Sequence, residues 1–257
     1  MKYMKKAFMI LMILGLLLLS GCDEQIGGNL QTNDVQAVEE VQLSADETPQ
    51  YNSECMTDWD DLKELMFSMG QEIKELDNIS DIDRTVITVN KCPITEREIK
   101  TKQIGNKSKT QKEIINELIR DKAVLSAALS KNIEPDMNEL NSYMERTKQV
   151  LNDAEMSSPL KAYCSGRGIT VDEYFIELEK IEYKNHQLMK YWETVLPREE
   201  IKKEAESRTN STNGSYIEYQ KRYDEVLCEY VEKYTDELVK DAKIKVLDRE
   251  IKAMEEL

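Results

Sequence analysis

Apolar residues recur at intervals of three and four along most of the chain, which is the spacing of one face of an α-helix. The pattern predicts one helix from about Asp58 to Leu76 and a stronger one from about Gln111 to Ser130, where Ile114, Leu118 and Leu125 share a face. The same spacing predicts further helices over about 96–104, 136–151, 158–166, 171–193 and 216–254.

One segment has the character of a β-strand. Residues 85–89 are β-branched throughout and lead into the turn-like sequence Asn90-Lys91-Cys92-Pro93. Between 198 and 215 the periodic pattern weakens, and residues 209–215 form a run of small polar residues that indicates a loop. The chain is therefore predicted to be mainly α-helical, with one short strand and a long C-terminal helix.

The first residues have a different character from the rest. Lys2, Lys5 and Lys6 precede an uncharged apolar run over 7–19, which is shorter than the roughly 20 residues that span a bilayer. The run ends in Leu19-Ser20-Gly21-Cys22 and resembles a bacterial lipoprotein signal. The resemblance implies a signal peptide over 1–21 and lipid attachment at Cys22; an ordinary secretory signal with a chance cysteine is the alternative.

The remaining chain divides into three parts by composition. Residues 22–54 are polar and acidic without a sustained period, which predicts a flexible tether. A helical domain is expected over 55–197, with a helical segment over 198–257 docking on it. The formal net charge of −15 and the absence of a concentrated basic face argue against binding to nucleic acid.

The sequence offers little catalytic chemistry. His186 is the single histidine, and we expect it to have a structural or surface role. Adjacent carboxylates, such as Asp60 and Asp61 or Glu199 and Glu200, point in different directions on a helix and form no acid–base pair. The sequence contains no nucleophile elbow, phosphate-binding loop or dinucleotide fingerprint. It therefore predicts no catalytic residue, no cofactor, no metal site and no small-molecule substrate.

Four cysteines besides Cys22 leave two alternatives open. Cys55, Cys92, Cys164 and Cys228 are an even set that an oxidising exterior could pair in any of three ways. Their long and irregular spacings fit unpaired or buried thiols equally well. No Cys-x-x-Cys occurs, which argues against a zinc site or a thioredoxin-type motif.

Several motifs in order resemble the SurA-type N-terminal chaperone domain, which is also found in PrsA-like foldases. Residues 86–90 and 93–99 resemble its opening strand, turn and threonine-capped helix. Residues 113–119 resemble its second helix, 131–136 an inter-helix turn, and 168–174 the start of its last helix. The resemblance implies a helical module that holds unfolded polypeptides.

The resemblance covers about 85–195 and departs from the family at two points. Lys91 and Cys92 stand where a turn glycine is usual, although Asn90 tolerates a left-handed conformation. Family members usually also carry a parvulin-type prolyl isomerase domain with active-site histidines, whereas the residues after Pro197 contain none. We therefore expect no isomerase domain and no enzymatic activity.

Together these observations predict a chaperone-like lipoprotein on the extracytoplasmic face of the cell membrane, anchored at Cys22. Its expected partners are unfolded or exported polypeptides. The alternative is a structural lipoprotein whose long helices scaffold one dedicated envelope partner. Flexible thioethers could contribute to client binding, from Met66, Met69, Met137 and Met144. The tyrosines of the last predicted helix are expected to pack within the molecule, namely Tyr216, Tyr219, Tyr223, Tyr230 and Tyr234.

Overall fold

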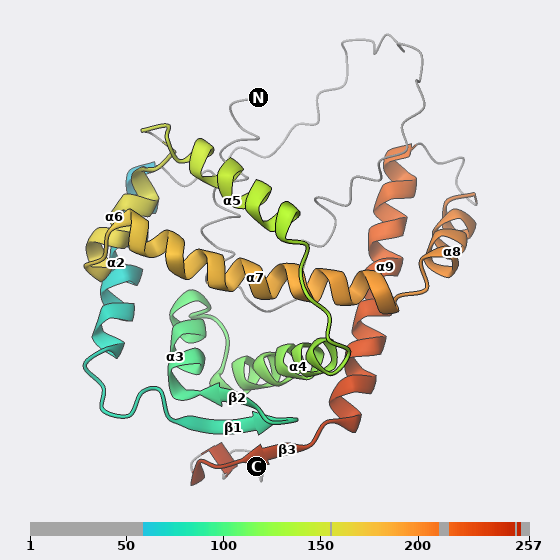
Figure 1. Cartoon of the computed structure of the whole chain (residues 1–257), viewed down its shortest axis with the longest axis horizontal. Helices are drawn as coiled ribbons and strands as arrows, with labels where there is room; N and C mark the ends of the chain where they lie inside the picture. The colour runs from blue at the N-terminus through green and yellow to red at the C-terminus, as the bar shows by residue number, and fades with distance from the viewer. Residues whose placement is uncertain (1–58, 155, 211–215, 250, 253–257) are drawn as a thin grey trace.

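The computed structural model describes residues 59–154, 156–210, 216–249 and 251–252 (Figure 1). This part of the chain forms eight helices and a small antiparallel sheet of three strands, which confirms the prediction of a mainly helical fold. The helices are α2 (Trp59–Leu76), α3 (Glu96–Gly105), α4 (Gln111–Ser130), α5 (Met137–Val150), α6 (Ser158–Arg167), α7 (Val171–Val195), α8 (Arg198–Asn210) and α9 (Tyr216–Asp241). The strands are β1 (Thr85–Val89), β2 (Cys92–Thr95) and β3 (Ile244–Val246).

Threonine side chains fix where three of the helices begin. Thr95, Thr110 and Thr170 each accept a hydrogen bond from the backbone N–H three residues later, and the glutamate there bonds back to the threonine N–H. Such reciprocal caps satisfy amide groups that the first helical turn leaves unpaired. The caps at Thr95 and Thr170 were predicted from the sequence, and the structure confirms both.

The sheet has the strand order β2-β1-β3. A tight turn joins β1 to β2, and its residues Asn90 and Lys91 both have positive φ values, 49° and 75°. The turn therefore forms without the glycine that the family resemblance led us to expect. The prediction of a single strand is wrong, because the sheet has three strands. Two of them gave no clear strand signal: β2 contains a proline, and β3 has only three residues. Segments this short carry no readable period.

The C-terminal region also differs from its prediction. The expected helix over 216–254 is interrupted: α9 ends at Asp241, and β3 follows and pairs with β1. Neither glycine nor proline marks this break, so the sequence gives no local stop signal. In the segment where the pattern weakens, α8 is a helix whose buried residues include only two apolar side chains, Ile201 and Ala205.

Four groups of buried apolar side chains hold these elements together. The first lies among α2, α5, α6 and α7, and includes Met69, Leu160 and Leu178. The second joins the sheet to α3, α4 and the end of α9. A third lies between α8 and α9, and a smaller fourth joins α4 to α7. The long helix α7 crosses the molecule from the first group to the third and fourth (Figure 1).

Helices α2 and α6 approach each other closely at two glycines. A Cβ atom added to Gly70 would lie 2.3 Å from the carbonyl oxygen of Tyr163, and one added to Gly166 would lie 2.1 Å from that of Phe67. No side chain fits at such distances, so glycine is required at both positions. Gly168 then ends α6 in the left-handed conformation, with φ 77°.

Candidate functional site

The methionines proposed for client binding lie mostly in the interior. Met66, Met69 and Met144 are buried in the group among α2, α5, α6 and α7. Met137 is exposed at the start of α5. The prediction of an adaptable methionine surface is therefore wrong for three of these residues. Their helical spacing is that of a core face, which the sequence cannot distinguish from a binding face.

The tyrosines of α9 behave largely as predicted. Tyr219, Tyr223, Tyr230 and Tyr234 are partly buried against the apolar group between α8 and α9. Tyr216 is the exception, because 78% of it is exposed in the first turn of the helix, next to exposed Ile217. Most of this aromatic row therefore stabilises the helix pair, and only its beginning is open to a partner.

The exposed apolar side chains of the other helices come from several elements. They are Leu65 and Phe67 on α2, Leu129 on α4, and Ile176 and Met189 on α7. Such side chains provide non-directional contact for an apolar segment of another polypeptide. With Met137 on α5, the exposed apolar side chains are distributed over four helices.

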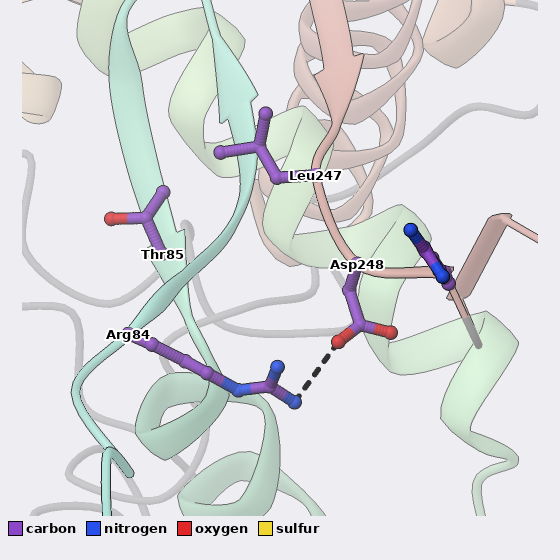
Figure 2. A pocket seen from close by; sticks show the side chains of 5 residues that line it. Arg84, Thr85, Leu247 and Asp248 are labelled. Atoms are coloured by element: carbon purple, nitrogen blue, oxygen red, sulfur yellow. Dashed lines mark ion pairs between the residues drawn. The ribbon is translucent and has the colours of Figure 1, made fainter.

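A shallow hollow of about 320 Å³ lies where the start of β1 meets the chain after β3 (Figure 2). Figure 2 shows Arg84 and Asp248 pointing toward each other across it. Arg84 Nη2 lies 2.9 Å from Asp248 Oδ2, and Arg84 Nε lies 2.7 Å from Glu96 Oε2. One guanidinium thus joins both carboxylates, and they raise its pKa. The lining residues of this sheet-end hollow are Arg84, Thr85, Leu247, Asp248 and Arg249.

An ionic cluster joins α3 to α4. The buried Lys102 Nζ lies 3.0 Å from Glu117 Oε2 and 3.5 Å from Asp121 Oδ2. Glu117 also accepts a hydrogen bond from Lys109 at 2.6 Å. Burial raises the pKa of Asp121 to about 6, although Lys102 acts in the opposite direction. Because each carboxylate has a lysine beside it, the cluster serves to position the two helices.

His186 takes part in the contact between α5 and α7. Its ring packs edge-on against Tyr143, with the ring centroids 5.7 Å apart. Partial burial lowers the pKa of His186 and raises that of Tyr143 to about 12. The neighbouring Gln187 donates to the carbonyl oxygen of Ile133 at 2.7 Å. This packing agrees with the structural role predicted for the histidine.

Two of the cysteines are free thiols. Cys92 is partly buried at the start of β2, and Cys164 is buried in α6. Burial raises the pKa of both, to about 11 for Cys164, so neither is activated as a nucleophile. Cys228 is partly buried in α9, and Cys55 lies outside the described residues.

Two features are absent from the described parts of the chain. Residues 59–154, 156–210, 216–249 and 251–252 contain no group of three or more histidine, cysteine or acidic side chains that could hold a metal ion. Within the same ranges, no helix is long and apolar enough to cross a membrane. The predicted signal peptide over 1–21, the lipid attachment at Cys22 and the tether over 22–54 lie outside these residues.

These features define a mainly helical protein with a small antiparallel sheet, a polar hollow at one end of that sheet and a dispersed set of exposed apolar side chains. Comparison of the chain with protein-family models, curated proteins and solved structures gives no match.

Proposed function

We propose that this protein is a lipoprotein, anchored at Cys22 on the extracytoplasmic face of the cell membrane, that holds unfolded exported polypeptides without catalysis. The observation that carries the proposal is the segment from β1 to α3. A hairpin, a threonine cap and a helix follow one another there, at the positions that resemble the SurA-type domain. Thr95 accepts from the Glu98 N–H at 3.2 Å, and Glu98 accepts from the Thr95 N–H at 2.9 Å.

The C-terminal segment gives a second line of support. Helix α9 packs against α4, and β3 adds to the sheet beside β1. A C-terminal helix that returns to the domain also occurs in some SurA-like proteins. Residues after the resembling segment thus join its sheet and its helix α4.

Holding an unfolded chain requires contact that tolerates many sequences, because clients differ in their side chains. The exposed apolar residues Leu65, Phe67 and Ile176 offer such contact without aligned polar groups. Non-directional apolar burial then supplies the attraction.

The proposal is tested with the full chain purified in detergent. A chemically unfolded client protein is diluted from denaturant, and its aggregation is followed by light scattering with and without the chain. We expect aggregation to fall as the chain approaches a one-to-one ratio with the client. An unrelated acidic protein of similar size is the control, and equal scattering in both samples would refute the holding function.

The absence of catalysis has its own test. Isomerisation of the bond before proline is slow, and a prolyl isomerase accelerates refolding that this step limits. We expect catalytic amounts of the full chain to leave the rate of such refolding unchanged. An increase in rate proportional to the chain's concentration would instead show isomerase activity.

One observation favours a second candidate, a scaffold for a dedicated envelope partner. Tyr216 and Ile217 are both more than three-quarters exposed at the start of α9. Crosslinking in cells from these two positions distinguishes the candidates. One partner captured in a fixed ratio would support the scaffold, and many weakly captured clients would support the chaperone.

A further inference from the structure

The outer edge of β3 is open for pairing. Asn90 donates its N–H to the carbonyl oxygen of Lys243 at 3.1 Å. Leu247 donates its N–H to the carbonyl oxygen of Val86 at 2.8 Å. Continuing the observed register by one position at each end places Asn90 opposite Lys243 and Val86 opposite Leu247. They are therefore hydrogen-bonded pairs of the antiparallel ladder, in which bonded and non-bonded pairs alternate.

This alternation fixes where the backbone of β3 points. Ile244 lies opposite Val89, and Val246 lies opposite Ile87, so both belong to non-bonded pairs. The N–H and C=O groups of Ile244 and Val246 consequently point away from β1. In the described chain no strand lies beyond β3, and these groups face outward at the edge of the sheet.

The opposite edge of the sheet is closed by a proline. Pro93 of β2 lies opposite Thr88. The N–H and C=O groups of Ile87 and Val89 point from β1 toward β2. Thr88 and Pro93 therefore form a non-bonded pair, and the backbone nitrogen of Pro93 faces away from β1. Proline has no N–H to offer a further strand. The β2 edge of the sheet is thus blocked by a proline, whereas the β3 edge keeps its backbone N–H donors.

The open edge is also basic in a chain whose formal net charge is −15. Exposed Lys91, Lys243, Lys245 and Arg249 lie in or next to the turn and strand that form this end of the sheet, and none has an ion pair with a described residue. Asp248, the acid that directly follows the edge, is already bound to Arg84. Exposed Asp241, two residues before Lys243, offsets one of these four basic side chains, and the remaining excess of positive charge can meet an acidic ligand.

These charges also distinguish between partners. Lysine on a short edge strand discourages pairing with other strands in general, and only a strand with acidic side chains opposite the lysines would offset this by charge attraction. A second copy docked edge to edge would bring Lys243 and Lys245 close to the same residues of its partner, where like charges repel. An extended segment with glutamate or aspartate at alternate positions would instead place its carboxylates on the face that carries Lys243 and Lys245.

We propose that the open edge of β3 binds an extended acidic segment of another polypeptide, which adds to the sheet as a fourth strand. The backbone groups of Ile244 and Val246 supply the hydrogen bonds, and Lys243 and Lys245 select for acidic side chains. This inference rests on the proposed holding function, and it names the class of client segment that the sheet accepts.

The test uses the full chain in detergent and a labelled synthetic peptide in which valine and glutamate alternate. Binding is measured by fluorescence anisotropy against a matched peptide with lysine in place of glutamate. The acidic peptide should bind at least about tenfold more tightly, and added salt should reduce the difference. Ile244→Pro removes one outward N–H and should weaken binding about tenfold, whereas the matched control Ile244→Thr keeps the N–H and should stay within about twofold.

Lys243→Glu/Lys245→Glu provides a second variant that leaves the backbone intact. It should bind the acidic peptide more weakly and the basic peptide more tightly than the parent chain. Equal affinity of Ile244→Pro and Ile244→Thr, with both folded by circular dichroism, would overturn the edge proposal. So would unchanged peptide preference in the double-lysine variant.

The holding function and the β3-edge site can be refuted independently of each other. If the chain suppresses client aggregation but does not bind the acidic peptide, the holding function stands and the edge proposal falls. If it binds the peptide at the β3 edge but does not suppress aggregation, the edge site stands and the general holding function falls.

Discussion

Gly70 and Gly166 show how single residues determine the packing of α2 on α6. Each glycine lies under a backbone carbonyl of the opposite helix, at a distance that leaves no room for a methyl group. The atoms that a Cβ would meet belong to the backbone, which cannot turn aside as a flexible side chain can. The close approach of the two helices therefore depends on glycine at both positions, where a hydrogen atom takes the place of a Cβ.

We expect Gly166→Ala to lower the free energy of unfolding by about 1–3 kcal/mol, because the added methyl group must push α2 and α6 apart. The measurement is urea-induced unfolding followed by circular dichroism. Ser165→Ala, at an exposed position one residue earlier on α6, is the control and should change stability little. Equal stability of the two variants would contradict the tight contact.

Asp121 gives a prediction about pH. Its pKa is about 6 in the folded chain and about 3.8 in its ordinary state, so the unfolded chain releases this proton first as pH rises. Ionisation of Asp121 therefore lowers stability progressively between about pH 4 and pH 6, with no further loss above that range. Asp121→Asn lacks this loss, so its free energy of unfolding should rise relative to the parent chain across the same window.

Urea unfolding at a series of values between about pH 4.5 and pH 7.5 checks this expectation. Asp61→Asn replaces an exposed carboxylate on α2 and serves as the control. The difference between Asp121→Asn and the parent should grow with pH and then level off, whereas the control difference stays flat. Parallel curves for all three proteins would show that Asp121 titrates normally.

At the residue scale, local chemistry was predictable and burial was not. The caps at Thr95 and Thr170 could be read from four neighbouring residues, because a capping box is completed within one helical turn. The burial of Met66 and Met144 could not be read from the sequence, because it depends on which other helix packs against the helix of each methionine. The two glycines of the α2–α6 contact give no sequence signal, because their neighbours in space are distant in sequence.

At the element scale, the helix starts are the features that local sequence controls most strongly. Helix α4 begins at a reciprocal cap in which Thr110 accepts from the Glu113 N–H at 3.3 Å, and Glu113 accepts from the Thr110 N–H at 2.7 Å. This helix contacts the sheet, α3, α7 and α9, so its position affects most of the described fold.

Thr110→Ala should therefore lower the free energy of unfolding by about 1 kcal/mol, because an amide of the first turn loses its acceptor. Ser108→Ala, two residues earlier in the exposed loop, is the matched control and should be close to neutral. Thermal and urea unfolding of both variants measure the difference. An equal effect of the two substitutions would show that the cap contributes nothing.

Element boundaries were predictable where periodicity and caps agree and failed where a segment is short. The predicted helix over 111–130 matches α4 at both ends, because a regular apolar stripe fills the segment between the polar break at 105–107 and the turn-like sequence at 132–135. The three-residue strand β3 was missed because Ile244 and Val246 continue an apolar pattern that also fits a helix. This segment forms a strand only because it pairs with β1, and β1 is distant from it in the sequence.

At the scale of the whole molecule, the proposed anchor makes a direct prediction. Cys22→Ser removes the sulfur that would carry the lipid, so the chain should move from the membrane fraction to the soluble extracytoplasmic fraction. Cys55→Ser is the matched control and should stay with the membrane. Fractionation with immunoblotting measures the distribution, and mass spectrometry of the N-terminal peptide detects the lipid. A Cys22→Ser chain that remains in the membrane fraction would contradict the anchor.

The pairing of β3 with β1 has a consequence for the order in which the molecule assembles. Lys243 donates its N–H to Asn90 Oδ1 at 2.8 Å across 153 positions of sequence. Contacts this distant cannot form until residues 243–246 have been synthesised and released, and they slow folding because a long loop must close first. The sheet is therefore completed late, and a chain that stops before Ile244 leaves the edge of β1 that faces β3 unpaired. Such an unfinished product would present its own unpaired strand to the proteases and folding helpers around it.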